Sequence, residues 1–85
     1  MSIGNKIDVI TYTDPNGNMR PVRLRVENED GTRIVLQVKS AMVKNAKTFG
    51  QSKIIRYSCQ SIINGALQNY EVSYDTNTMK WLLYI

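Results

Sequence analysis

The chain has no histidine and only one cysteine among its 85 residues. The missing imidazole removes the commonest general base near neutral pH and the commonest metal ligand. With one thiol, a zinc site would need carboxylates alone or a partner chain. The five glycines stand singly, so none of them builds a glycine-rich phosphate loop. These absences predict a protein that is not an enzyme, takes no small-molecule substrate and holds no metal or other cofactor.

The single cysteine, Cys59, also excludes a disulfide within the chain. Its place in an alternating apolar run predicts an inward-facing side chain that behaves as a small hydrophobe. No stretch approaches the roughly 20 consecutive apolar residues that a membrane-spanning helix needs. The N-terminus also lacks the charged and then apolar pattern of a secretory leader. We therefore expect a cytoplasmic protein with no membrane association.

Acidic residues are missing from the forty positions between Asp30 and Glu71, in a chain of net charge +4. Lysines and arginines in and near this interval could neutralise the phosphates of a polyanion. Arg23 and Arg25 are two residues apart on a predicted strand, so both side chains would point to the same face of the sheet. A solvated charged face is the alternative interpretation. The candidate nucleic-acid contacts are Arg23, Arg25, Lys39, Lys44, Lys47, Lys53 and Arg56.

Turn signals are plentiful, and the clearest is Asn64-Gly65, which lies between two runs of alternating apolar and polar residues. Asn-Gly tolerates positive φ at both central positions of a two-residue hairpin loop. Such a loop places apolar side chains on one face and polar side chains on the other, as a half-buried sheet requires. The pairs predicted on the apolar face are Ile63 with Ala66, Cys59 with Tyr70, Tyr57 with Val72 and Ile55 with Tyr74.

The first turn, Asp-Pro-Asn-Gly-Asn, leaves two registers open. A three-residue loop pairs Ile10 with Val22, whereas a four-residue loop pairs Val9 with Leu24 and Thr11 with Val22. The second register buries more apolar area, and we prefer it.

Two further turns complete the predicted hairpins. Glu29-Asp30-Gly31 fits a three-residue loop that pairs Val26 with Ile34 and Leu24 with Leu36. The last turn, residues 75–78, predicts pairing of Tyr74 with Met79, Val72 with Trp81 and Tyr70 with Leu83.

One helix of about nine residues is predicted between Ser40 and Gly50. Ser40 suits an N-cap, and Met42, Val43, Ala46 and Phe49 recur at helical spacing. Gly50 is placed to end the helix. The helix would be marginal alone and would depend on packing against the sheet.

These elements predict a single mainly β (α+β) domain over residues 1–85, with a loose N-terminus at 1–6. Two three-stranded antiparallel meanders are joined by the short helix, in the order βββ-α-βββ. They would form either a small partly open barrel or two packed sheets. The predicted core comprises Val9, Val22, Leu24, Val26, Ile34, Leu36, Val38, Val43, Ala46, Phe49, Ile55, Tyr57, Cys59, Tyr70, Val72, Trp81 and Leu83.

Several apolar side chains fall on the outer face of the second meander. Ile62, Leu67, Leu82 and Tyr84 would form a contact surface if exposed together, unless another element covers them. We therefore expect a non-catalytic interaction module that binds protein, including a second copy of itself, through this surface or a sheet edge. The alternative is nucleic-acid binding, for which Tyr12 and Tyr84 are the two rings left outside the core. Catalysis would require groups from a partner chain or a bound cofactor.

Overall fold

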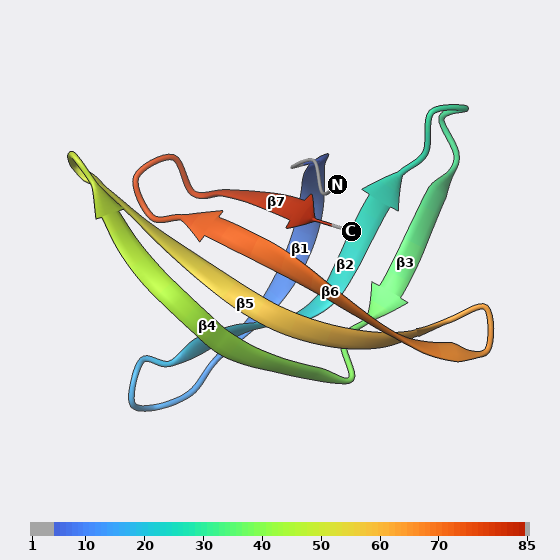
Figure 1. Ribbon diagram of the computed structural model, residues 1–85, viewed down its shortest axis with the longest axis horizontal. Helices are drawn as coiled ribbons and strands as arrows, with labels where there is room; N and C mark the ends of the chain where they lie inside the picture. The colour runs from blue at the N-terminus through green and yellow to red at the C-terminus, as the bar shows by residue number, and fades with distance from the viewer. Residues whose placement is uncertain (1–4, 85) are drawn as a thin grey trace.

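The computed structural model describes residues 5–84, which form one antiparallel sheet of seven strands. The strands are β1 (Asn5–Thr13), β2 (Met19–Glu27), β3 (Arg33–Gln37), β4 (Ser40–Phe49), β5 (Ser52–Ile63), β6 (Ala66–Asp75) and β7 (Lys80–Tyr84). Their order in the sheet is β3-β2-β1-β7-β6-β5-β4, so β3 and β4 are the two edges (Figure 1). The first strand begins at Asn5, within the N-terminus that was predicted to be loose. Residues 1–4 of that predicted segment lie outside the described residues.

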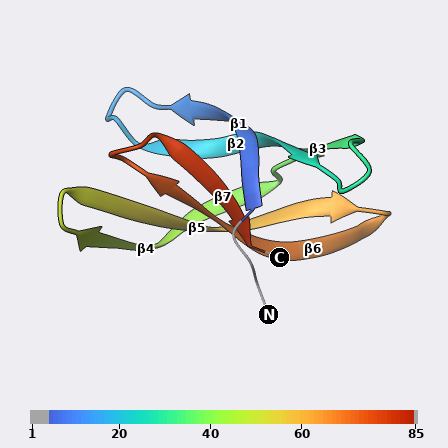
Figure 2. The same ribbon diagram turned by 90° about the horizontal axis from the view of Figure 1, so that it is seen from above.

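The sheet curls strongly, because its two edge strands are consecutive in the chain. Only Val38 and Lys39 separate β3 from β4, and a link of this length spans at most about 11 Å. Six interstrand spacings of a flat sheet would place the edges roughly 29 Å apart. Figure 2 shows β2 and β3 lying over β4, β5 and β6 as the result of this curl. One continuous sheet replaces the two packed sheets that were one of the predicted alternatives.

The core lies between the two overlapping parts of the sheet. Eight apolar residues are buried there, and all eight were predicted as core: Leu24, Leu36, Tyr57, Cys59, Tyr70, Val72, Trp81 and Leu83. The ring of Trp81 lies 5.7 Å from that of Tyr57 and 4.8 Å from that of Tyr74. The hydroxyl of Tyr57 donates to the carbonyl of Met19 at 2.7 Å, which ties β5 to β2 across the core.

Two hairpins have the predicted registers. Asn64 and Gly65 both adopt positive φ, and the four pairs predicted around them are present. Gly31 likewise has positive φ, and Leu24 pairs with Leu36 as expected. Both loops were predicted correctly because their residue types match the backbone angles that the turns require.

The predicted helix is wrong, since residues 40–49 form edge strand β4. A β-bulge at Lys44 interrupts the pairing of β4 with β5. Val43 pairs with Tyr57 before the bulge, and Ala46 pairs with Ile55 after it, so two residues three apart share the inner face. The bulge therefore reproduces a helical spacing within a strand. Four predicted core residues are also exposed: Ile34, Val43, Ala46 and Phe49.

Two turns differ from their predicted registers. In the first hairpin Val9 pairs with Leu24, as in the preferred register, but a bulge at Val22 makes Thr11 pair with Pro21. Next to the turn the pairing is therefore that of the three-residue loop, the register that we did not prefer. In the last hairpin Trp81 pairs with Tyr74, two residues away from its predicted partner. A two-residue shift preserves the face on which each side chain lies, so Trp81 remains in the core.

Candidate functional site

The edge strand β4 presents ten residues of backbone with a neighbour on one side only. The residues that flank the two-residue loop at Asn64-Gly65 form a hydrogen-bonded pair, and such pairs recur at every second residue of β5. These residues direct their backbone N–H and C=O groups to β6, and the residues between them direct theirs to β4. The bond from the Lys39 amide to the Gln60 carbonyl agrees with this assignment. By the same alternation, the free backbone N–H and C=O groups of β4 belong to Ala41, Val43, Ala46 and Thr48. A row of this kind is a template for pairing with another strand.

Apolar side chains of β4 are exposed on both faces of the sheet. Met42 and Phe49 lie on the outer face with 72% and 62% of their surface exposed, and Val43 lies on the inner face with 60% exposed. An edge strand in contact only with water would be expected to alternate apolar and polar side chains. Sequence reasoning assigned these residues to a helix face. The missed signal was Gly50-Gln51, a Gly-X loop between the paired residues Phe49 and Ser52 that is typical of a hairpin.

A shallow groove follows the inner side of β4 where it approaches the β1–β2 loop. One part measures about 520 Å³ and the adjoining part about 240 Å³. Both parts are lined by Asn18, Met19, Val43 and Tyr57. Ala46, Ile55 and Tyr74 extend the apolar floor, and Lys53 contributes a cation. The groove therefore offers an apolar surface directly beside the unpaired backbone.

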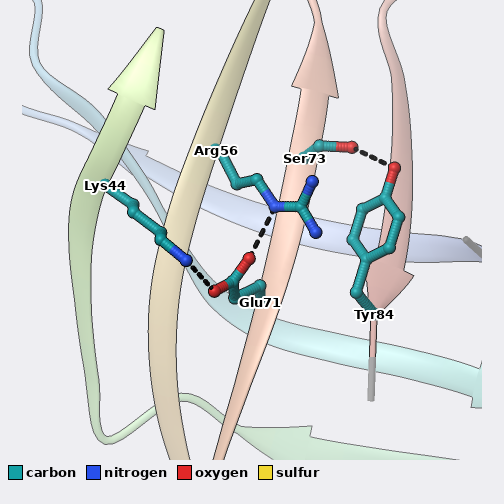
Figure 3. A network of polar contacts seen from close by, with 5 residues as sticks. All are labelled: Lys44, Arg56, Glu71, Ser73 and Tyr84. Atoms are coloured by element: carbon teal, nitrogen blue, oxygen red, sulfur yellow. Dashed lines mark hydrogen bonds and ion pairs between the residues drawn. The ribbon is translucent and has the colours of Figure 1, made fainter. Parts of the chain in front are cut away.

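On the outer face, Glu71 connects β4, β5 and β6 through a polar network (Figure 3). Its carboxylate accepts from Lys44 Nζ at 2.5 Å and from Arg56 Nε at 2.6 Å. The bond from Lys44, aided by that from Arg56, lowers the pKa of Glu71. The guanidinium of Arg56 also lies 4.0 Å from the ring of Tyr84, whose hydroxyl is 3.3 Å from Ser73 Oγ. One carboxylate is thus shared by two cations, which leaves this face positive.

The seven predicted nucleic-acid contacts do not form one surface. Arg23 and Arg25 lie on the outer face of the β1–β3 part of the sheet, while Lys44, Lys47 and Arg56 lie on the outer face of the β4–β6 part. These two faces point away from each other because the core lies between them. Lys39 is in the β3–β4 link, and Lys53 faces the groove.

Sequence reasoning missed two arginines that extend the β1–β3 face. Arg20 stacks over the exposed ring of Tyr12 at 5.2 Å, and Arg33 pairs in register with Glu27. Arg25 forms an ion pair with Asp8. The side-chain amide of Gln37, oriented with its oxygen toward Arg23, accepts from that guanidinium. Arg20, Arg23 and Arg25 thus have side-chain partners within the protein.

The four predicted protein contacts share the outer face but form two separate groups. Ile62 and Leu67 are a cross-strand pair at the tip of the β5–β6 hairpin and are half-exposed. Leu82 and Tyr84 lie on β7, opposite Ser73 and Glu71, and both are partly buried. Tyr84 is engaged by Arg56, so the second group is less available for contact than the first.

The described residues hold no cluster of three or more metal-ligating side chains from His, Cys, Asp and Glu. Cys59 is fully buried, and burial raises the pKa of its thiol to about 11, which disfavours the reactive thiolate. No helix in residues 5–84 is long and apolar enough to cross a membrane.

Comparison with known proteins gives no match: no family model, no curated protein and no solved structure is significantly similar to this chain.

Proposed function

We propose that this protein is a non-catalytic interaction module that binds an extended segment of a partner protein as an eighth strand beside β4. The observation that carries the proposal is the ten-residue edge strand with exposed apolar side chains on both faces. Strand addition satisfies the free backbone groups and covers those side chains in one step. The other edge, β3, is half as long, and its residues Arg33 and Gln37 are polar.

Self-association through β4 is disfavoured by charge. Lys44 and Lys47 are the only charged residues of the strand, and no acidic residue accompanies them. Centred antiparallel pairing of two copies would bring the lysines of one strand close to those of the other, and like charges across a ladder are destabilising. Edge lysines and a bulge are devices by which proteins prevent pairing between identical copies. A heterologous partner is therefore the better occupant.

Two proline variants test the role of the edge. Ala46→Pro removes an outward N–H of β4 without removing a ladder bond to β5, and should abolish strand addition. Val35→Pro is the matched control, because by alternation the Val35 N–H points outward from the other edge, β3. Both variants should stay folded, which thermal unfolding would check.

The binding measurement begins with extended peptides selected from a random displayed library on the wild-type protein. We expect the selected peptides to bind wild type and Val35→Pro equally and to lose at least tenfold in affinity for Ala46→Pro. N-methylation of alternate peptide amides should have the same effect, and it leaves the protein unaltered. Equal binding to both variants, or no enrichment of any peptide, would refute the proposal.

Nucleic-acid binding is the second candidate, favoured by the arginines of the β1–β3 face and the outward ring of Tyr12. Titration of labelled single- and double-stranded oligonucleotides at about 50 and 200 mM salt would test it, because phosphate contacts weaken steeply over that range. Arg23→Ala with Arg25→Ala should then reduce both the affinity and its salt dependence. Absence of binding at the lower salt concentration would eliminate this candidate.

A further inference from the structure

We infer, on the basis of the proposed strand addition at β4, that the partner segment alternates acidic and apolar residues. Its acidic side chains would face the lysines on the outer side of β4. Its apolar side chains would enter the groove between β4 and the β1–β2 loop. This specifies the chemistry of the partner, which strand addition alone leaves open because backbone pairing is independent of sequence.

The alternation follows from strand geometry. Successive side chains of an added strand point to opposite faces of the sheet, as they do in β4. On the inner face the added strand would lie beside Val43 and Ala46, and its side chains would meet the groove lined by Met19, Ile55 and Tyr57. This floor is apolar, and burial of a valine- or leucine-sized side chain there is favourable. A charged side chain placed over this apolar floor would lose its hydration. Lys53 is the one charged residue that lines the larger part of the groove.

Charge on the outer face selects acidic side chains. Lys44, Lys47 and Arg56 lie there, and Glu71 is shared between Lys44 and Arg56. Among the described residues Lys47 has no ion pair within 4 Å, and it lies on the exposed strand itself. An acidic residue of an added strand would lie within cross-strand distance of Lys47. Basic residues at the same position would be repelled.

The test uses three capped nine-residue peptides, alternating Glu with Val, Lys with Val, or Glu with Ser. They are titrated against the wild-type protein at low salt and followed by fluorescence anisotropy. We expect the Glu–Val peptide to bind at least tenfold more tightly than either of the others. The Lys–Val peptide tests the charge preference, and the Glu–Ser peptide tests the apolar anchor in the groove.

Charge reversal in the protein provides the reciprocal test. Lys47→Glu should lower the affinity for the Glu–Val peptide and raise the affinity for the Lys–Val peptide, each by about tenfold. Lys80→Glu is the matched control, because it makes the same change in net charge on the exposed surface of β7, away from β4. It should alter neither affinity by more than about twofold.

The outcomes separate this inference from the proposed function. Equal binding of Glu–Val and Lys–Val peptides that still depends on Ala46 would overturn the acidic preference and leave strand addition intact. Binding of Glu–Ser as tight as that of Glu–Val would overturn the apolar anchor alone. Binding that survives N-methylation of the Glu–Val peptide would overturn strand addition itself. A dimer in sedimentation that Ala46→Pro dissociates would identify a second copy as the occupant and would also overturn the inference.

Discussion

The buried hydroxyl of Ser61 allows the curl of the sheet to be tested in solution. Ser61 on β5 donates to the carbonyl of Gln37 on β3 at 2.8 Å and lies 2.6 Å from the hydroxyl of Tyr70, which donates to it. Strands β5 and β3 are separated in the sheet order by β6, β7, β1 and β2. The bond between them therefore exists only because the sheet folds over itself.

Ser61→Ala removes two hydrogen bonds and leaves the Tyr70 hydroxyl and the Gln37 carbonyl without this partner. A hydrogen bond contributes about 1 kcal/mol net, and an unsatisfied buried polar group costs about 1–3 kcal/mol. We expect Ser61→Ala to lower the free energy of unfolding by about 2–3 kcal/mol. Tyr70→Phe removes only one bond and should cost about 1 kcal/mol. The double variant has no orphaned hydroxyl, so its cost should fall about 1 kcal/mol below the sum of the two.

Urea unfolding followed by the fluorescence of Trp81, the only tryptophan, measures all three variants. The slope m should be unchanged if the folded state keeps its compactness. Ser58→Ala, an exposed serine on the same strand, is the control and should change stability by less than about 0.5 kcal/mol. A cost below about 0.5 kcal/mol for Ser61→Ala, or strict additivity of the two substitutions, would refute the bridge between β5 and β3.

Three further predictions use the same unfolding assay. Leu24→Ala should cost about 2–5 kcal/mol because Leu24 is fully buried, whereas Ile34→Ala at the exposed edge should cost less than about 1 kcal/mol. Burial raises the pKa of Cys59 to about 11 from an ordinary value of 9.0, so the contribution of the protonated thiol to stability is complete below pH 9 and is lost as the pH rises to about 11. Cys59→Ala should therefore lose less stability than the wild type between these pH values. An equal loss in both proteins would contradict the raised pKa of Cys59. Met79→Gly should raise the melting temperature by a few degrees, because Met79 is exposed and has a φ of 58° that glycine adopts without strain; a lower melting temperature would count against strain at this turn.

Local turn chemistry accounts for most of what the sequence could predict. Asn64-Gly65 and Gly31 have backbone angles that few other residues adopt, and the registers around them follow from the lengths of their loops. The alternation of β5 and β6 then identified four of the eight buried apolar side chains. The first and last turns were harder, because loops of three or four residues admit several registers. In the first hairpin a bulge also adds an extra residue, Val22, to β2, and no composition rule predicts it.

The placement of the candidate site could not be predicted in the same way. Whether Arg23 and Lys44 share a surface depends on how far the sheet curls, which is a property of the whole fold. The curl carries these residues to opposite outer faces, although both belong to the same sheet. Sequence proximity of charges was therefore a poor guide to a common binding surface, whereas alternation within one hairpin was a good guide to the core.

The bulge at Lys44 explains both the wrong helix and the proposed site. It turns the charged side chain to the outer face, where Glu71 binds it, and it places Val43 and Ala46 together above the groove. A strand of strict alternation could not put two residues three apart on one face. The apolar spacing that suggested a helix packed on a sheet thus belongs to an edge strand, whose inner face carries Val43 and Ala46 beside the groove. β4 also runs away from β3 beyond their two-residue link, so the curl leaves most of its free edge open to an added strand (Figure 1).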